Sequence, residues 1–118
     1  MIMMTLNCRG LASKPKKLVV CRLVEDKHVD VLFLQDFMGN GQLFVVELKS
    51  MFKGWTFLSL DACGKYGGLL LGWRSRFSHL LNYWGVDSGL CASLFSFELN
   101  LDICVVNIYG PYIDKEGY

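Results

Sequence analysis

The sequence lacks the features that mark secreted, zinc-stabilised and membrane-spanning proteins. Its five cysteines are odd in number and scattered, and no C-x-x-C pair occurs. This pattern argues against both a zinc site and a disulfide framework, and favours a reducing compartment. No apolar run approaches the ~20 residues needed to cross a bilayer, and Met1–Leu6 is too short for the hydrophobic region of a signal peptide. We therefore expect an intracellular protein, nuclear or cytoplasmic, with no membrane partner.

The chain also lacks an excess of charge of either sign. It carries 12 Lys and Arg against 11 Asp and Glu in 118 residues. No global basic field attracts nucleic acid, so any site for a polyanion must be local. The 53% of hydrophobic residues supply a core for one domain. The mean hydropathy of +0.33 is high for so small a domain and indicates apolar surface that meets other protein.

What the sequence does contain is organised around Asp30–Asp36. Four consecutive apolar residues follow Asp30, and the Gly39–Gly41 segment leaves no room for a helix. A short apolar run of this kind predicts a strand that is covered on both faces, as in an α/β sheet. Ligands of such sheets bind outside the carboxyl ends of the strands, where Asp36 lies. Taken alone, Asp36 is more often a solvated loop acid than a ligand.

The preceding segment predicts a strand, helix and strand unit. Met1–Cys8 reads as a strand, Gly10 permits a turn, and Ser13 with Pro15 begins a helix that runs to about Lys27. A right-handed βαβ connection places Asn7 and Asp36 at the same edge of adjacent parallel strands. An apolar stripe on this helix predicts its buried face and leaves its charged residues in water. The stripe comprises Leu18, Val20, Cys21, Leu23 and Val24, and the charged residues are Lys16, Lys17, Arg22, Glu25 and Lys27.

The remainder predicts a second helix followed by antiparallel strands. Gln42–Phe52 has a helical apolar face, and Gly54 is typical of a residue just past a helix end. The strands expected are Trp55–Leu60, Gly67–Trp73, Ser78–Trp84, Leu90–Leu99 and Asp102–Tyr109. The fold class is thus α/β, a mixed sheet with helices on one face. The second face is too apolar for solvent, and we expect something outside this sequence to cover it.

Four motifs occur in order along the chain: Leu6–Leu11 (LNCRGL), Asp30–Asp36 (DVLFLQD), Gly67–Leu69 (GGL) and Asn107–Pro111 (NIYGP). In this order and spacing they resemble the endonuclease/exonuclease/phosphatase superfamily. The resemblance is greatest to the endonuclease domain of plant LINE-type (non-LTR) retrotransposons. It implies that residues 1–118 are a single partial domain, the first half of a four-layer α/β sandwich (DNase I-like).

The resemblance also implies a Mg²⁺- or Mn²⁺-dependent hydrolase that cleaves phosphodiester bonds in DNA. Asn7 would orient the attacking water or the phosphate, and Asp36 stands where the family has its metal-binding Glu. Arg9 falls where some members contact a DNA phosphate, and Tyr109 falls where the family has a Tyr bonded to the scissile phosphate. Mg²⁺ prefers hard oxygen ligands, few of them from protein, which suits a single carboxylate beside an amide.

The sequence departs from the family at three points. Asp36 is one methylene shorter than Glu, Phe37 replaces a small Thr, and the later Gly-Asp-x-Asn and Ser-Asp-His motifs are absent. The general base of the family therefore has no counterpart, and His28 and His79 read as ordinary surface residues. We predict a truncated endonuclease domain that is inactive by itself. The resemblance implies that this domain binds DNA. Through its exposed sheet face it would either self-associate or bind a missing second half.

Other interpretations of the same residues stay open. The chain could be a non-catalytic remnant that binds nucleic acid or protein, or a phosphatase of the same superfamily that acts on small phosphoesters. Asn7 alone could be a turn residue, and Tyr109 could pack on Pro111. Asn107 could form a half-buried polar pair with Tyr109, and Gly67–Gly68 reads better as the start of a strand than as a phosphate loop.

Overall fold

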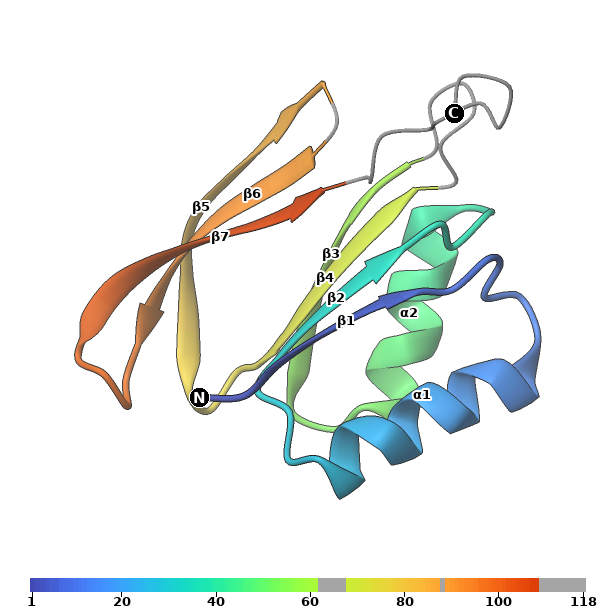
Figure 1. Ribbon diagram of the computed structural model, residues 1–118, viewed down its shortest axis with the longest axis horizontal. Coiled ribbons are helices and arrows are strands. Elements are labelled where there is room, and N and C mark those ends of the chain that lie inside the picture. The colour runs from blue at the N-terminus through green and yellow to red at the C-terminus, as the bar shows by residue number, and fades with distance from the viewer. Residues whose placement is uncertain (62–67, 88, 109–118) are drawn as a thin grey trace, which may run out of the picture.

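The structure is a computed structural model that describes residues 1–61, 68–87 and 89–108. Within these ranges the chain forms two helices and two sheets (Figure 1). None of the helices in this part of the chain is long and apolar enough to cross a membrane. The elements in order are β1 (Met3–Asn7), α1 (Lys14–Asp26), β2 (Val31–Gln35), α2 (Gly41–Met51), β3 (Trp55–Leu60), β4 (Leu69–Arg74), β5 (Ser78–Val86), β6 (Gly89–Ser96) and β7 (Leu101–Ile108).

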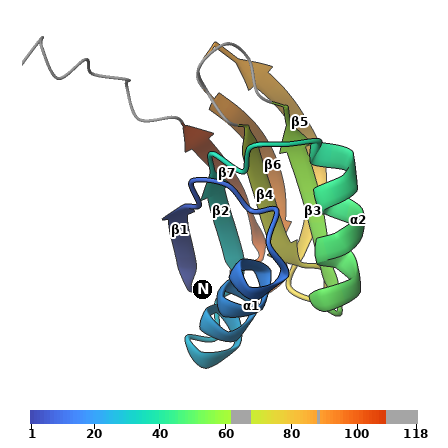
Figure 2. The same ribbon diagram turned by 90° about the vertical axis from the view of Figure 1, so that its right-hand side faces the viewer.

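The first sheet is mixed, with strand order β1-β2-β4-β3. β1 and β2 are parallel, with Asn7 opposite Gln35, and the other two pairings are antiparallel. Both helices pack on one face of this sheet (Figure 2). Leu32 and Leu34 of β2 share a core cluster on that face with Val20 of α1 and Leu48 of α2. The predicted α/β class, a mixed sheet with helices on one face, is confirmed.

α1 begins where its sequence predicts, but it buries a different face. The Ser13 side chain accepts a hydrogen bond from the Lys16 backbone N–H, 3.3 Å away, and Pro15 lies in the first turn. The buried residues are Lys17, Val20 and Val24, whereas Leu18 and Leu23 of the predicted stripe are exposed. The expectation that Lys17 faces water is therefore wrong. The position is tolerated because the ammonium of Lys17 is paired.

Lys17 connects α1 to α2. Its ammonium donates hydrogen bonds to the Glu47 carboxylate and, at 3.3 Å, to the Ala12 carbonyl. It also lies 5.0 Å from the centre of the Phe44 ring, at a distance suited to a cation–π contact. A buried charge is stable only when it is paired and hydrogen-bonded, and these partners meet that requirement. The buried lysine thus fixes how the two helices pack.

α2 agrees with its predicted residues within one position at each end. The Asn40 side chain caps it by accepting from the Gln42 and Leu43 backbone N–H groups, at 3.0 and 3.3 Å. Phe44 and Leu48 are buried, as the apolar spacing predicts. Gly54 follows the helix with a φ of 78°, a backbone conformation that glycine adopts without a steric penalty.

The last three strands form a second sheet instead of extending the first. β5, β6 and β7 pair antiparallel in that order, and they cover the face of the first sheet that the helices leave free (Figure 1). Leu69, Leu71 and Trp73 of β4 share a core cluster there with Leu90 and Leu94 of β6. The expectation that something outside this sequence must cover this apolar face is therefore wrong, because β5 to β7 of the same chain cover it.

β6 ends at Ser96, three residues before its predicted end. The Ser96 hydroxyl accepts from the Leu99 backbone N–H at 3.1 Å, and the Ser96 carbonyl accepts from that of Asn100 at 2.8 Å. These bonds close a turn, so the alternation of Phe97 and Leu99 does not continue the strand, and both side chains are exposed. The outer face of the second sheet also exposes apolar side chains, among them Trp84, Val86, Val106 and Ile108.

Candidate functional site

The carboxyl ends of β1 and β2 lie side by side, as the βαβ pattern predicts. After the register pair Asn7 and Gln35, the Cys8 backbone N–H donates to the Gln35 carbonyl at 2.8 Å. The Gly10 N–H then donates to the Asp36 carbonyl at 2.7 Å. The two loops that leave these strands are therefore hydrogen-bonded to each other, and Asn7 and Asp36 lie at one edge of the sheet.

The backbone at this edge is held in uncommon conformations. Arg9, Asp36 and Met38 have positive φ values of 48°, 60° and 56°, and Gly10 has 94°. Such conformations cost on the order of 1–3 kcal/mol each for residues other than glycine, and surrounding contacts must enforce them. Asp36 is fixed by the bond that its N–H donates to the Gly68 carbonyl at 2.7 Å.

Phe37 explains how the loop after β2 is anchored. Its side chain is fully buried and contacts the Phe44 ring of α2 edge-on, with ring centres 5.3 Å apart. Gly68 has a φ of 95°, and a side chain there would overlap the Phe37 ring. Phe37 is thus a core side chain that anchors the loop carrying the half-buried Asp36. The predicted strand start at Gly67–Gly68 begins in the structure at Leu69, and Gly67 lies outside the described residues.

The predicted site residues differ in what the structure shows of them. Asn7 is exposed, and its side-chain oxygen accepts from the Arg9 backbone N–H at 3.2 Å. Arg9 is exposed and Asp36 is half-buried. In the described part of the chain, no hydrogen bond joins the side chains of Asn7 and Asp36. Tyr109 lies outside the described residues, and the functional roles of all four stay predictions.

Lys16 brings a positive charge to the same edge. Its ammonium donates to the carbonyls of Cys8 and Arg9, at 2.8 and 3.1 Å. Burial raises the pKa of the Cys8 thiol to about 11; the charge of Lys16 lowers it, and that of Asp36 raises it further. An ammonium and a carboxylate thus act on one thiol at this edge, which makes Cys8 a poor nucleophile, since a thiol reacts as its thiolate.

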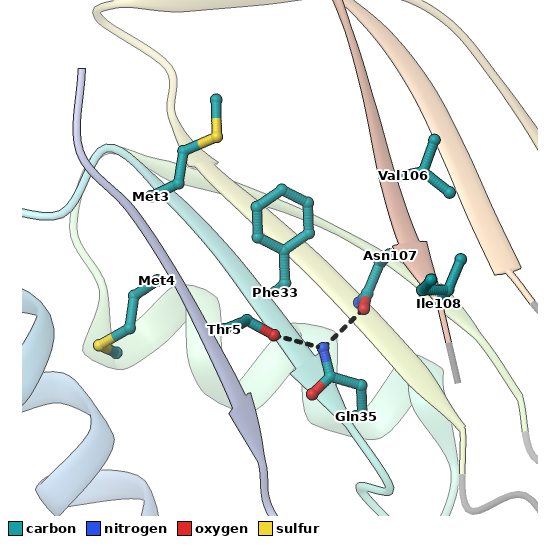
Figure 3. A pocket seen from close by; sticks show the side chains of 8 residues that line it. All are labelled: Met3, Met4, Thr5, Phe33, Gln35, Val106, Asn107 and Ile108. Carbon is teal, nitrogen blue, oxygen red and sulfur yellow. Dashed lines mark hydrogen bonds between the residues drawn. The ribbon is translucent and has the colours of Figure 1, made fainter. Parts of the chain in front are cut away.

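Sequence reasoning missed the polar network that joins the two sheets beside this edge (Figure 3). The Gln35 side-chain amide donates to the Thr5 hydroxyl at 2.8 Å and to the Asn107 side-chain oxygen at 2.7 Å. The Asn107 amide in turn donates to the carbonyls of Leu34 and Leu70, at 3.1 and 2.8 Å. Asn107 is only 1% exposed, so it is a fully buried residue. An uncharged amide within an apolar strand was the available signal, because buried polar groups are hydrogen-bonded.

The donors at the strand ends suit a hard cation only in part. Within residues 1–61, 68–87 and 89–108, no three His, Cys, Asp or Glu side chains form a cluster that could hold a metal ion by themselves. Asp36 and Asn7 offer one carboxylate and one amide oxygen. Mg²⁺ is commonly held by one or two carboxylates, with water and substrate phosphate completing its shell. In donor type these two residues suit Mg²⁺ or Mn²⁺, but the Asn7 side-chain oxygen already accepts from the Arg9 N–H, so metal binding by the pair stays a prediction.

Known structures resemble this architecture closely. An endonuclease/exonuclease/phosphatase from Bacteroides vulgatus superposes with a TM-score of 0.69 at 16% identity, covering 98% of this chain and 54% of its own. A mannosyl-6-phosphatase from Bacteroides thetaiotaomicron gives 0.70 at 12% identity, covering 98% and 53%. This chain has the endonuclease/exonuclease/phosphatase fold. No protein-family model matches the sequence, and no curated protein matches it either.

The same fold occurs in nucleases. An AP endonuclease from Leishmania major superposes with a TM-score of 0.63 at 19% identity, covering 91% of this chain and 39% of its own. The chain thus spans about half the length, or less, of the endonuclease/exonuclease/phosphatase structures that it matches. At these identities the likeness establishes the DNase I-like fold, while substrate and activity belong to the proposal that follows.

Proposed function

We propose that this chain is the first half of the Mg²⁺-dependent endonuclease domain of a LINE-type retroelement, inactive by itself. The observation that carries the proposal is the placement of Asn7 and Asp36 at the carboxyl ends of two paired parallel strands. In α/β sheets this is where ligands bind. The four-motif resemblance supports the retroelement branch, and the shared fold supports the superfamily.

Each predicted residue has a chemical role in this proposal. Asp36 holds the divalent ion, which stabilises charge on phosphoryl oxygens when it is bound. Asn7 orients the attacking water or the phosphate, and its exposed amide is free to do so apart from the bond that it accepts from the Arg9 backbone. Arg9 contacts a DNA phosphate, and Tyr109 donates a hydrogen bond to the scissile phosphate.

Inactivity follows from the lack of a proton acceptor at this edge. His28 precedes β2 and therefore lies at the opposite end of that strand from Asp36. His79 lies near the start of β5, in the second sheet. Neither imidazole follows β1 or β2 at the end where Asn7 and Asp36 lie. General acid–base catalysis contributes about 10²–10⁴-fold to such reactions, and among residues 1–61, 68–87 and 89–108 no imidazole lies at this edge to supply it.

Phosphatase activity on small phosphoesters is the second candidate. The mannosyl-6-phosphatase from Bacteroides thetaiotaomicron superposes with a TM-score of 0.70, against 0.63 for the AP endonuclease from Leishmania major. The near-neutral charge of the chain also favours a small substrate over a long polyanion. A third candidate is a remnant that binds nucleic acid or protein without catalysis.

Plasmid nicking with Mg²⁺ or Mn²⁺ separates these candidates. We expect the purified chain to nick no faster than its Asp36→Ala variant, with Asp102→Ala as a control for loss of an exposed carboxylate in β7. Nicking that EDTA stops, and that Asp36→Ala but not Asp102→Ala abolishes, would refute inactivity. Metal-dependent release of phosphate from p-nitrophenyl phosphate, without nicking, would favour the phosphatase.

DNA binding tests the remaining candidate. Retarded migration of a DNA duplex without cleavage, weakening as salt rises, would indicate a binding remnant. We expect Arg9→Ala to weaken such binding and Arg22→Ala on α1 to leave it unchanged, since both arginines are exposed but only Arg9 lies at the strand ends. Equal effects of both variants would contradict a phosphate contact at Arg9.

A further inference from the structure

Three polar side chains from three strands meet between the two sheets, just before these strands reach the candidate site. Thr5, Gln35 and Asn107 belong to β1, β2 and β7, and the side-chain amide of Gln35 donates to both of the others (Figure 3). These three residues are named here the Gln35 network. The apolar side chains of β1 pack toward the helices, so strand alternation turns Thr5 and Asn7 toward the second sheet. The network therefore shares a face of the first sheet with Asn7.

Each member of the network comes one or two residues before a predicted site residue. The pairs are Thr5 and Asn7, Gln35 and Asp36, and Asn107 and Tyr109, of which Tyr109 lies outside the described residues. Because a strand moves as a stiff unit over two residues, any shift of a network residue along or across its sheet carries the following site residue with it. The network thus lies directly behind the predicted site.

The hydrogen bonds leave the two amides of the network a single orientation. Both side-chain N–H groups of Asn107 are used on the carbonyls of Leu34 and Leu70, so its oxygen has to face Gln35. Gln35 in turn has to present its NH₂ group, whose second N–H reaches the Thr5 hydroxyl. Turning either amide over would set oxygen against oxygen. The network therefore selects one placement of β7 over β1 and β2.

Asn107 also holds the pairing of β2 with β4 next to Asp36. The two carbonyls that it bonds belong to Leu34 and Leu70, which are register partners. Further along the same two strands, the Asp36 backbone N–H donates to the Gly68 carbonyl at 2.7 Å. A side chain of the second sheet thus grips the first sheet two residues before Asp36 on one strand and two residues after Gly68 on the other.

Apolar contacts pack the two sheets together without help from this network. Their core cluster comprises Leu69, Leu71 and Trp73 of the first sheet and Leu90, Ala92, Leu94 and Val105 of the second. Apolar side chains often stabilise a core as well as a buried polar network does, whereas a fully bonded network favours one arrangement over others of similar packing. At the strand ends, such a fixed arrangement is what a site needs to hold its reacting groups in register.

We propose that Gln35, held between Thr5 and Asn107, is a positioning residue of the candidate site, which fixes Asp36 relative to Asn7 and to the end of β7. The inference rests on the proposed function, since it concerns the carboxylate that would hold the divalent ion. Gln35 acts through the backbone of β2 and not through a ligand contact of its own. Loss of its amide should let the end of β2 move against β7 and weaken metal binding while the chain stays folded.

Manganese binding, followed by electron paramagnetic resonance, tests this role in Gln35→Met. Methionine matches glutamine in length and is flexible, so the variant keeps the packing and removes the hydrogen bonds. We expect the dissociation constant for Mn²⁺ to rise by about tenfold. Gln42→Met is the matched control, because Gln42 is exposed on α2, and it should leave the constant unchanged. Unchanged affinity in Gln35→Met, where Asp36→Ala lowers it, would overturn the positioning role and leave the proposed function standing.

A double variant separates positioning from stability. Asn107→Leu leaves one N–H of Gln35 without its acceptor, so the urea midpoint should fall. Adding Gln35→Met removes that unpaired group, and the midpoint should recover in part. The dissociation constant for Mn²⁺ should nevertheless stay raised in the double variant, by no more than in Gln35→Met alone, because both changes break the same hydrogen bond. Affinity that recovers together with the midpoint would mean that the network only stabilises the fold.

Amide hydrogen exchange supplies a readout that needs no metal. The Asp36 N–H donates to the Gly68 carbonyl, and the Gly10 N–H donates to the Asp36 carbonyl. In Gln35→Met we expect both amides to exchange about tenfold faster, while that of the buried Leu48 in α2 keeps the parent's rate. Unchanged rates at Asp36 and Gly10 would overturn the inference. If Asp36→Ala binds Mn²⁺ as the parent does, the proposed metal role fails, and these exchange rates alone decide whether Gln35 positions Asp36.

Discussion

Asn107 of β7 accepts a hydrogen bond from the side-chain amide of Gln35 in β2, with the two atoms 2.7 Å apart (Figure 3). This bond crosses between the two sheets, directly before Asp36 leaves β2. Asn107 also donates to carbonyls of β2 and β4, so a single buried amide ties the second sheet to two strands of the first. The spacing of the sheets next to the candidate site is therefore set by polar contacts as well as by the core.

The first prediction concerns this amide. Asn107→Ala removes three hydrogen bonds from a buried position, and at about 1 kcal/mol each we expect the free energy of unfolding to fall by about 3 kcal/mol. Urea unfolding followed by tryptophan fluorescence measures this. Cys104→Ser, at an exposed position of the same strand, should change it by less than about 0.5 kcal/mol. Equal losses in both variants would mean that Asn107 does not join the sheets.

The second prediction concerns Lys17 and Glu47. Lys17→Met keeps the buried stem and removes the charge, so we expect the free energy of unfolding to stay within about 1 kcal/mol of the parent or to rise. Glu47→Gln leaves the buried ammonium without its carboxylate and should cost about 2 kcal/mol, since Glu47 itself is half exposed. Thermal and urea unfolding compare the two. A larger loss in Lys17→Met than in Glu47→Gln would contradict this account.

The third prediction concerns the pH dependence of stability. Burial, opposed by Lys16 and reinforced by Asp36, raises the pKa of Cys8 from 9.0 to about 11 in the folded protein. Below pH 9 the thiol is protonated in both states, and its contribution to stability is complete. Between pH 9 and about 11 only the unfolded chain loses the proton, so stability falls as pH rises. Cys8→Ala should lose less stability over this interval than the parent in urea titrations at several pH values.

Thiol alkylation provides an independent check of the same environment. At pH 8 we expect iodoacetamide to modify the exposed Cys104 readily and the buried Cys8 slowly, as read from peptide mass spectra over time. In denaturant the two rates should converge. Rapid modification of Cys8 in the folded protein would show that its thiol is neither buried nor raised in pKa.

The fourth prediction concerns the metal affinity of the candidate site. Asp36→Glu introduces the longer carboxylate that the proposed endonuclease function expects at this position, and we expect Mn²⁺ affinity, measured by electron paramagnetic resonance, to rise by about tenfold. Asp102→Glu lengthens an exposed carboxylate of β7 and serves as the control. An affinity that is the same in the parent, Asp36→Glu and Asp36→Ala would show that Asp36 is not a metal ligand.

Local sequence signals were sufficient to predict the helices and strands of the first sheet and their order along the chain. α1 starts at the Ser13 cap, with Pro15 in its first turn, and α2 starts at the Asn40 cap, which precedes its apolar spacing. Caps and hydrophobic periodicity act within a few residues, so they can be read from the sequence. The same reasoning placed Asn7 and Asp36 at one sheet edge, since a βαβ unit has a fixed hand and a parallel register. These are short-range and topological rules, which sequence spacing alone satisfies.

Which element covers the second face of the first sheet depends on contacts between distant parts of the chain. β5, β6 and β7 form a separate sheet over the first, and no local pattern distinguishes this arrangement from an extension of the same sheet. The burial of Lys17 and Asn107 depends on partners 30 and 73 residues away, Glu47 and Leu34. Until these distant partners are known, Lys17 reads as exposed and Asn107 as half-buried, because full burial of a polar side chain is stable only once its hydrogen bonds are made.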